Sequence, residues 1–194
     1  MIIGNKSTFA IESSITRAYG RLSFRALGYF VIHIGGTSYG INSPDATLLA
    51  CSFDEIKNRF IDRGTHKASF AIEPSAKKIA NAINMSIYSE SQIDENFFGM
   101  SLSEFYDIVT TNHIIWAPDG DEAFDDGSHV LHFDIENHVR LIGFKRGNSD
   151  IDDKEYHSLI DLWLDADEFY SILIRWYDVF ESEWEAAVKW DNIE

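Results

Sequence analysis

The residues of this chain with the clearest chemical potential lie between Trp116 and Phe133, in WAPDGDEAFDDGSHVLHF. Five carboxylates fall within eight positions there, with no lysine or arginine among them: Asp119, Asp121, Glu122, Asp125 and Asp126. So dense a group of carboxylates could bind a metal ion, transfer protons, form turns or attract a cationic partner. The surrounding residues help to separate these four roles.

A regular calcium-binding loop is not encoded in this acidic segment, residues 119–126. An EF-hand loop needs Asp or Asn at its first, third and fifth positions and Gly at its sixth. Counting from Asp119, the fifth and sixth positions are Ala123 and Phe124, and counting from Asp121 the third is Ala123. Both registers fail, which leaves only an irregular calcium site open.

Histidine and cysteine offer little more for a metal site. His129 and His132 follow the carboxylates in HVLH, and on a strand two residues three apart point to opposite faces. The chain has no HExxH, and its one cysteine, Cys51, cannot build a zinc site of several thiolates. We therefore expect no metal and no cofactor, hydrogen-bonded or solvated histidines, and a core position for Cys51 in the apolar LLACSF.

Signatures of phosphate and dinucleotide binding are missing as well. Gly35, Gly36 and Gly40 match neither a Walker loop nor a dinucleotide fingerprint. A hairpin turn explains those glycines. Because Asp, Gly and Pro are common turn formers, APDGDE and DDG also fit consecutive turns that lead into a hairpin. That interpretation is compatible with binding, since loops present charges to partners.

The charge of the chain is strongly uneven. The net charge is −16, yet residues 1–88 hold ten Lys/Arg and six Asp/Glu, whereas residues 89–194 hold six Lys/Arg and 26 Asp/Glu. Binding to nucleic acid requires a basic surface that displaces counterions. We therefore expect no nucleic-acid partner. An acidic surface suits solubility, cations or a basic protein partner.

Length and composition predict one globular domain over residues 1–194. Hydrophobic residues make up 45% and charged residues 25% of the 194, close to globular averages. A lone cysteine favours a reducing compartment. The N-terminus MIIGNKSTFAIESS lacks a secretory apolar core, and no run approaches the roughly 20 apolar residues that span a bilayer. We expect a cytoplasmic protein without a membrane partner; its oligomeric state stays open.

The elements that must position these residues follow from periodicity and capping. β-branched and aromatic residues, with turn residues beside them, predict strands over 7–17, 28–36, 37–41, 66–72 and 159–164. Capping boxes predict helices from SFDE (52–55) to about Arg63 and from SLSE (101–104) to about Thr111. Another helix begins near Pro74. Asp165 with Glu168 opens the longest helix, which extends to about Val188.

Apolar stripes predict which helix faces are buried. On the helix after SFDE, the stripe consists of Phe53, Ile56, Phe60 and Ile61. On the C-terminal helix, apolar residues recur at spacings of three and four: Phe169, Ile172, Leu173, Trp176, Phe180 and Trp184. Strands and helices alternate without a regular βαβ rhythm. The fold class is therefore α+β, with a largely antiparallel sheet packed with several helices and a long C-terminal helix.

The stretch HVLHFDIENHVRLIGF (129–144) predicts a hairpin with two possible registers. A two-residue loop at Glu136 and Asn137 places Phe133 opposite Arg140. A three-residue loop, 136–138, places Phe133 opposite Leu141 and sets Asp134 beside Arg140. We favour the three-residue loop, because it pairs apolar residues with each other across the strands.

Whole segments of the chain resemble the immunity protein 42 family of bacterial polymorphic toxin systems. The resemblance covers most of the chain and lies in SFRALGYFVIHIGG (23–36), PDATLLACSFDEI (44–56), WAPDGDEAFDDGSHVLHFD (116–134), WLDADEFYSIL (163–173) and FESEW (180–184). It implies a protein without a substrate that binds a cognate toxin domain, delivered into neighbouring cells and encoded beside it. The family supplies no catalytic residues to carry over.

These arguments favour a non-catalytic immunity protein that sequesters its toxin through an acidic surface. The expected toxin contacts are Asp119, Asp121, Glu122, Asp125 and Asp126, with a second patch at Asp150, Asp152 and Asp153. A basic nuclease is one toxin class that fits an acidic inhibitor. Two alternatives stay open: a small metal-dependent hydrolase that uses the 119–126 cluster with His129 and His132, and a structural subunit that docks on an unrelated protein.

Overall fold

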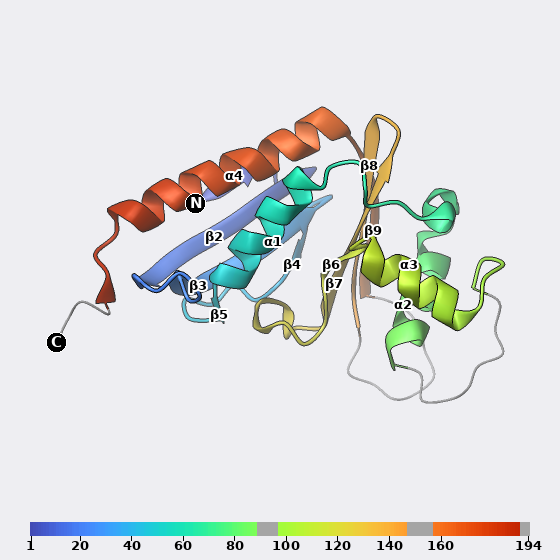
Figure 1. Ribbon diagram of the computed structural model, residues 1–194, viewed down its shortest axis with the longest axis horizontal. Coiled ribbons are helices and arrows are strands. Elements are labelled where there is room, and N and C mark those ends of the chain that lie inside the picture. Colours follow the sequence, from blue (N-terminus) through green and yellow to red (C-terminus); the bar gives the residue numbers. More distant parts are fainter. Residues whose placement is uncertain (89–96, 147–156, 191–194) are drawn as a thin grey trace.

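The computed structural model describes residues 1–88, 97–146 and 157–190 (Figure 1). Residues 89–96, 147–156 and 191–194 lie outside the described residues. The described chain forms two antiparallel sheets with helices packed between and beside them. The expected α+β class with antiparallel sheets is confirmed, although the strands form two sheets and not one.

The first sheet has the strand order β1-β2-β3-β4, and β5 also pairs with β3. Its strands are β1 (Ile2–Gly4), β2 (Phe9–Ala18), β3 (Ala26–Ile34), β4 (Thr37–Tyr39) and β5 (Thr47–Leu48). The turn between β3 and β4 is Gly35-Gly36, and both glycines have positive φ, as a tight turn of this kind requires. The strands expected at 7–17, 28–36 and 37–41 are therefore confirmed.

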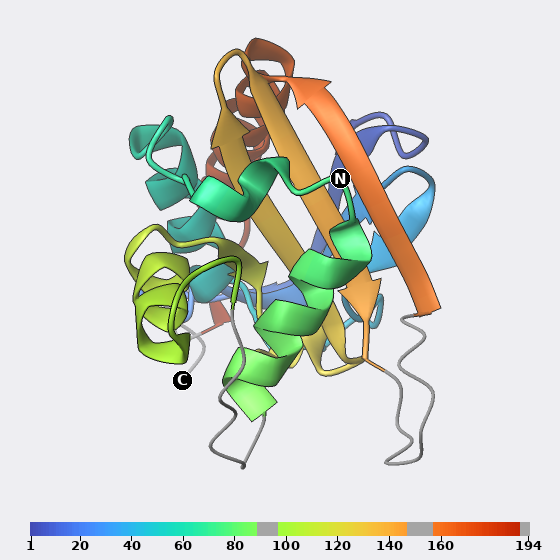
Figure 2. The ribbon, with the colours of Figure 1, turned by 90° about the vertical axis from the view of Figure 1, so that its right-hand side faces the viewer.

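The second sheet has the strand order β6-β7-β8-β9. Its strands are β6 (Ile115–Ala117), β7 (Ser128–Ile135), β8 (His138–Lys145) and β9 (His157–Asp165). The two longest α-helices described, α4 (Ala166–Ala186) and α2 (Ala76–Tyr88), lie on opposite sides of it, together with α1 (Ala50–Ile61) and α3 (Leu102–Thr111) respectively (Figures 1 and 2).

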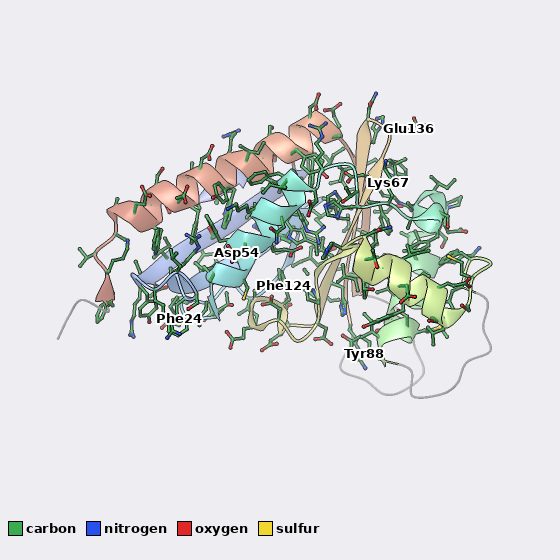
Figure 3. All side chains as sticks on the ribbon, in the orientation of Figure 1. Phe24, Asp54, Lys67, Tyr88, Phe124 and Glu136 are labelled. Carbon is green, nitrogen blue, oxygen red and sulfur yellow. The ribbon has the colours of Figure 1, made fainter. Side chains whose placement is uncertain are left out.

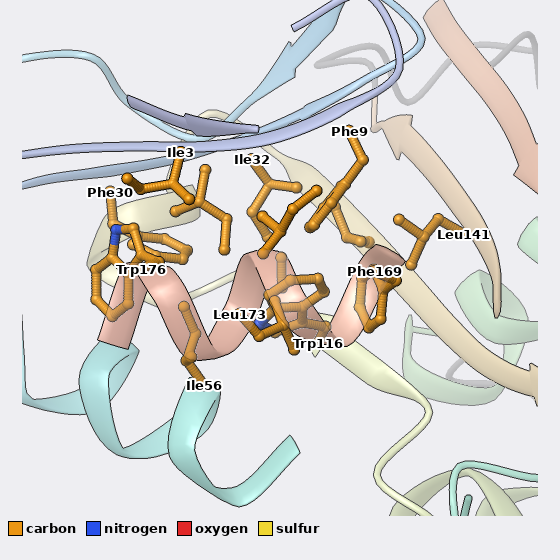
Figure 4. Close-up of a cluster of buried hydrophobic side chains, with 14 of the residues drawn as sticks. Ile3, Phe9, Phe30, Ile32, Ile56, Trp116, Leu141, Phe169, Leu173 and Trp176 are labelled. Carbon is orange, nitrogen blue, oxygen red and sulfur yellow. The ribbon is translucent and has the colours of Figure 1, made fainter. Parts of the chain in front are cut away.

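One hydrophobic core lies between the first sheet, α4, α1 and one face of the second sheet. In Figure 4, α4 runs between the sheet residues Ile32 and Phe9 on one side and Ile56 of α1 on the other. The apolar stripe expected on α4 supplies this core: Phe169, Ile172, Leu173, Trp176 and Phe180 are buried, and Trp184 packs against them. Burying an aromatic or aliphatic side chain contributes about 1.5–3 kcal/mol.

A second core lies on the other face of the second sheet, beneath α2 and α3. It contains Leu131 and Phe133 of β7 and Ile142 and Phe144 of β8. The central strands β7 and β8 are therefore buried on both faces, which is unusual for an antiparallel sheet. This double burial explains why apolar residues occupy adjacent positions, such as Val130 and Leu131 on β7 and Leu141 and Ile142 on β8.

The helix predictions have mixed outcomes. The capping box at Ser101 and Glu104 is present, and the cap formed by Asp165 on Glu168 opens α4 as expected. The capping box predicted at Ser52 and Glu55 is wrong, because α1 already begins at Ala50 and Ser52 is buried within its first turn. The expected apolar stripe of α1 is correct at Phe53 and Ile56, whereas Ile61 at its end is 62% exposed.

Two further local predictions are corrected by the structure. Residues 66–72 do not form a strand; Ser69–Ile72 form a short 3-10 helix, η1, whose Phe70 and Ala71 enter the second core. Cys51 is exposed on α1 and does not lie in the core. It occupies the helix surface because Phe53 and Ile56, two and five residues later, are the positions that face inward.

The preferred hairpin register is also wrong. Phe133 pairs with Arg140 and Ile135 with His138 across a two-residue turn at Glu136 and Asn137. The like-with-like argument fails because both faces of this hairpin are buried, so apolar residues are needed on each face in either register. Asp134 pairs with Val139, and Arg140 instead reaches Asp161 on β9, with its Nε and Nη2 each 2.8 Å from a carboxylate oxygen.

Within the described residues, no helix combines the length and apolarity needed to cross a membrane.

Candidate functional site

The acidic segment connects β6 to β7 and lies beside α1. Its central residues Glu122–Phe124 form a 3-10 turn, η2, and Ala123 and Phe124 are buried against the first sheet. Figure 3 shows Phe124 of this segment below Asp54 of α1. The backbone N–H of Ile41 donates to the carbonyl of Ala123 at 2.8 Å, which fastens the segment to the loop after β4.

Three of the five carboxylates have roles within the fold. Asp121 caps η2 by accepting the backbone N–H of Ala123 at 3.0 Å. Asp126 accepts the backbone N–H of Ser128 at 3.1 Å and pairs with Lys145 at 2.6 Å. The turn-forming interpretation of the sequence is therefore confirmed for Asp121 and Asp126.

Asp119 also has partners within the fold. It accepts the hydroxyl of Tyr88 at 2.8 Å and lies 3.6 Å from Arg146. Burial, followed by the Asp119 carboxylate, raises the pKa of Tyr88 to about 12, so the hydroxyl keeps its proton and donates it to Asp119. This contact ties the acidic segment to the end of α2.

The other two carboxylates, Glu122 and Asp125, are exposed. Among the residues that the structure describes, neither pairs with a lysine, arginine or histidine. Their charges therefore face solvent at the tip of the segment. Asp150, Asp152 and Asp153, the second expected patch, lie outside the described residues.

A surface groove separates α1 from residues 113–124. Its volume is about 180 Å³, and its lining includes Cys51, Glu55, His113, Trp116, Asp121 and Phe124. The groove is thus partly apolar and partly acidic. It joins the acidic segment to a helix that lies more than fifty residues away in the sequence.

The environment of Cys51 shows that carboxylates from both sides gather at one end of this groove. The pKa of its thiol is raised, first by partial burial and then by the charges of Asp121, Asp54 and Glu122. A raised pKa keeps the thiol protonated and therefore disfavours nucleophilic reactivity. Although the expected core position of Cys51 is wrong, its environment remains unsuited to a catalytic thiolate.

A smaller cavity of about 60 Å³ lies farther along α1. It is lined by Glu55, Asn58, Arg59, Asp62, His66 and His113, so it shares Glu55 and His113 with the groove. Groove and cavity together form a path along one face of α1. The carboxylates on this path are Glu55, Asp62 and Asp121.

Arg59 forms the inner wall of the cavity and is 1% exposed. Its Nη2 donates to the backbone carbonyls of His113 and Ile115, each at 3.1 Å, and pairs with Glu55 at 2.8 Å. Its Nη1 lies 2.9 Å from Nδ1 of His132. These bonds fix the separation between α1 and β6, and therefore the width of the groove.

His132 and Asp134 extend this buried polar network to α4. Tyr170 donates its hydroxyl to Asp134 at 2.7 Å, and the backbone N–H groups of Gly64 and His66 donate to the same carboxylate at 2.8 and 3.2 Å. Burial works to raise the pKa of Asp134, but the bonds from His132 and Tyr170 outweigh it and lower that pKa to about 2. The carboxylate therefore stays charged inside the protein.

His132 is neutral in this network. Burial, assisted by the nearby Arg59, lowers its pKa to about 3, against the opposing effect of Asp134. Because Arg59 can only donate, Nδ1 of His132 must accept, and the ring proton resides on Nε2. Nε2 lies 3.4 Å from the hydroxyl oxygen of Tyr170 and 3.5 Å from Oδ1 of Asp134, so its proton points toward these two oxygens.

The expected separation of the two β7 histidines is confirmed. His132 faces the first core, in contact with Trp116 and Phe169, whereas His129 stacks on Phe144 at 4.8 Å in the direction of α2. The two imidazoles cannot share one metal ion. Among the described residues, no group of three or more His, Cys, Asp or Glu side chains is arranged to hold a metal.

The α1 face of the groove is the part that the sequence interpretation missed. One signal was available: Arg59 follows Phe53 and Ile56 at helical spacing of three, which places a cation on the apolar face. Glu55 four residues before it is its helical partner. His66 and His113, which come from separate loops, carried no comparable signal.

Comparisons with known proteins agree with this architecture. The crystal structure of CdiI from Burkholderia dolosa AUO158 matches 94% of this chain and 99% of that chain, with a TM-score of 0.55 and 20% identity, a likeness of fold. The comparison with curated proteins gives no match. The family model described as immunity protein 42 matches residues 1–179. The chain therefore belongs to the immunity protein 42 family.

Proposed function

We propose that this protein neutralises a cognate toxin by binding it, without catalysing a reaction, and that the acidic segment together with α1 forms the contact surface. Membership of an immunity protein family supports the toxin as partner. The observation that carries the surface assignment is the convergence of Asp54, Asp121 and Glu122 around Cys51, beside an open groove.

The charge of this surface favours a basic partner. The acidic segment contributes exposed Glu122 and Asp125, and α1 contributes Asp54 and the partly exposed Glu55. Opposed charges accelerate encounter and fix orientation more than they add to final affinity. Rapid capture suits a protein whose partner is harmful while free. A toxin domain that acts on nucleic acid, and is therefore basic, is the partner class that we favour.

The alternative, a metal-dependent hydrolase built on the same carboxylates, has weaker support. Three of them already have partners within the fold. Asp119 accepts a hydrogen bond from Tyr88, Asp121 caps η2, and Asp126 pairs with Lys145. His129 and His132 lie on opposite faces of β7 and cannot complete a site with them. The remaining carboxylates, Glu122 and Asp125, are exposed to solvent and have no charged partner among the described residues that would orient them toward a substrate.

The cellular setting completes the proposal. We place the encounter in the cytoplasm of the producing cell, with the C-terminal domain of a delivered toxin as the partner and residues 1–194 acting as one domain. Neither nucleic acid nor membrane takes part in binding. A measurement of the mass of the complex will show whether one or two copies of this protein bind each toxin.

Co-expression with the toxin domain encoded beside this gene tests the proposal. The expected result is restored growth of cells that make both proteins, and a complex that co-purifies. The control is a set of cells that express the toxin together with an unrelated acidic protein of similar charge. Growth arrest in the presence of this protein, with no complex recovered, would contradict the proposed function.

A further inference from the structure

The second sheet ends in a long strand with an open edge. β9 pairs with β8 on one side, and no described strand pairs with its other side. Figure 2 shows β9, in orange, at the margin of this sheet. β9 has nine residues, whereas the other edge strands described, β1, β4, β5 and β6, have three, three, two and three. A long edge strand presents a row of unpaired backbone groups, so β9 differs from every other described edge of the fold.

The register of β9 shows which of its backbone groups face that edge. The N–H of Ala166, directly after β9, donates to the carbonyl of Asn137 in the β7–β8 turn at 2.9 Å. Because the direction of hydrogen bonding alternates along an antiparallel strand, the even-numbered residues of 160–164 also point toward β8. The N–H and C=O groups of Asp161 and Trp163 therefore point outward. Among the described residues, no loop or side chain forms a hydrogen bond with either backbone.

The features that usually protect an edge strand are missing from this part of β9. Natural sheets block exposed edges with proline, lysine, bulges or inward-pointing charges. Residues 159–164 contain no proline and no lysine, and the register shift of β9 lies before Ile160. Asp161 is the charged residue of this stretch, and its carboxylate pairs with Arg140 at 2.8 Å. The backbone between Ile160 and Leu164 is thus open to another strand.

The side chains of β9 offer apolar surface on both faces of the sheet. Trp163 is 46% exposed, and Cζ of Arg140 lies 5.3 Å from the centroid of its ring. On the other face, Ile160 and Leu162 pack against the first core but stay partly exposed. A neighbouring strand would cover all three apolar side chains, and tryptophan is typical of the residues that anchor an interface.

Two strands of different origin fit this edge: one from a second copy of this protein, and one from the toxin. Each copy carries a net charge of −16, and repulsion between two proteins of such high charge opposes their association. A basic toxin is attracted by the same charge. The charge of the chain therefore favours a strand of the toxin as the occupant of the β9 edge.

The position of β9 allows one toxin domain to reach both this edge and the acidic segment. Ser128, two residues after the acidic segment, pairs with Lys145, and Lys145 pairs with His157 at the start of β9. Neighbouring strands are about 4.8 Å apart, so the start of β7 lies about 10 Å from β9. A standard interface, which covers about 800 Å² on each partner, is wider than this separation.

We propose that a strand of the toxin pairs with β9 and extends the second sheet, while the acidic segment guides its approach. This assignment rests on the proposed function, because it names how the same toxin is held. In strand addition, main-chain hydrogen bonds supply affinity, and side chains at alternate positions supply specificity. The outward N–H and C=O groups of Asp161 and Trp163 form those bonds, and the added strand covers Trp163 on one face and Leu162 on the other.

Hydrogen exchange, resolved to single amides by NMR, measures this pairing directly. In the free protein, the amides of Asp161 and Trp163 should exchange faster than those of Leu162 and Leu164, which face β8. The probe is the toxin domain encoded beside this gene, separated from the wild-type complex in denaturant and refolded. In the complex, exchange at Asp161 and Trp163 should slow by at least about tenfold. Equal exchange rates at these two amides in free and bound protein would contradict strand addition.

Two substitutions at one position separate the backbone from the side chain. Trp163→Pro removes the outward N–H and places a ring where the added strand would lie, whereas Trp163→Thr removes the same indole but keeps the N–H. An edge strand tolerates proline where its N–H faces solvent, and thermal unfolding of both variants verifies that the fold is retained. Kd for the toxin domain should rise a few-fold for Trp163→Thr and at least about tenfold further for Trp163→Pro.

The outcomes separate this inference from the proposed function. Wild-type protein that fails to bind the toxin domain contradicts the proposed function itself. Wild-type binding with unchanged exchange at Asp161 and Trp163, or with equal Kd for the two variants at 163, overturns strand addition alone. If Trp163→Pro does not fold, the exchange measurement on wild-type protein decides. A free protein that is a dimer with both amides already protected would assign the edge to a second copy and overturn the toxin strand.

Discussion

Arg59 and His132 meet inside the protein, with Nη1 of the guanidinium 2.9 Å from Nδ1 of the imidazole. The contact joins α1 to β7 across 73 positions of sequence. The same guanidinium donates to two carbonyls that flank the start of β6, and it borders the cavity beside α1. One buried cation therefore sets the distance between the two walls of the candidate binding surface.

Removing this cation should destabilise the protein severely. Arg59→Met keeps most of the side-chain volume but leaves the His113 and Ile115 carbonyls and Nδ1 of His132 without their donor. Breaking a buried, hydrogen-bonded charge typically costs about 3–5 kcal/mol. The control is Arg63→Met, which breaks an exposed pair with Asp167 and should cost less than about 1 kcal/mol. Urea unfolding measures both, and equal losses would contradict the assigned role of Arg59.

Buried neutral His132 should make stability depend on pH in a predictable direction. Its pKa is about 3 in the folded protein, below the ordinary 6.5. Between these two values the unfolded chain binds the proton and the folded chain does not, so stability falls as pH drops below 6.5. From about pH 7.5 to about pH 5, this one group accounts for a loss of about 2 kcal/mol.

The variant His132→Gln isolates that contribution. Gln offers an oxygen to Arg59 but cannot titrate. The free energy of unfolding of the variant should therefore fall by about 2 kcal/mol less than that of the wild type over the same pH interval. His138→Gln, at an exposed position of the hairpin, is the control and should follow the wild type. Asp134, with its pKa lowered to about 2, adds a further loss only when the pH falls below about 3.8. Parallel curves for His132→Gln and wild type would exclude a neutral buried His132.

The hairpin turn offers a stabilising substitution. Glu136 has a φ of 52°, the left-handed region that favours glycine, whereas the next residue, Asn137, does not have positive φ. Positive φ at the first turn position is the pattern of a type II′ turn, in which glycine is preferred there. Glu136→Gly should raise the free energy of unfolding by about 0.5–1 kcal/mol. Asn137→Gly should give no gain, and a gain at 137 in place of 136 would refute the observed register.

Local sequence signals were informative where a helix end depends only on nearby residues. The capping pair Ser101 and Glu104 forms as predicted because its two hydrogen bonds require nothing beyond four residues. Ser52 and Glu55 carry the same pattern, but the fold uses them differently. The side chain of Glu55 pairs with Arg59, and Ser52 is buried. These tertiary contacts shift the start of α1 to Ala50.

Interactions between distant segments could not be read in the same way. The hairpin register depends on Arg140, which pairs with Asp161 and donates to the carbonyls of Ala71 in η1 and of Glu73 directly after it. Rules of cross-strand pairing that consider only residues 129–144 cannot include those partners, because the partners lie outside that stretch. The same holds for the candidate site: the carboxylates of the acidic segment were visible in the sequence, whereas the α1 wall and the cavity at His66 depend on contacts among three separate loops and helices.

The two exposed carboxylates of the acidic segment should control the rate of toxin association. Glu122→Lys with Asp125→Lys reverses charges that have no ion pair among the described residues, so the fold should tolerate it. Because unpaired surface charges act over a distance, the double variant should slow association more than it speeds dissociation, by about tenfold at low salt. The loss should shrink as salt is raised, since the Debye length falls to about 8 Å at physiological ionic strength.

The control for this charge reversal must carry the same change in net charge at another place. Asp178→Lys with Glu185→Lys on α4 meets that condition, because both residues are exposed and lie outside the lining of the groove. If the field is local to the acidic segment, stopped-flow mixing with the toxin domain at two salt concentrations will show slower association for the first pair only. Equal slowing by both pairs would mean that overall charge, and not this segment, guides the encounter, and the contact assignment for residues 119–126 would then be withdrawn.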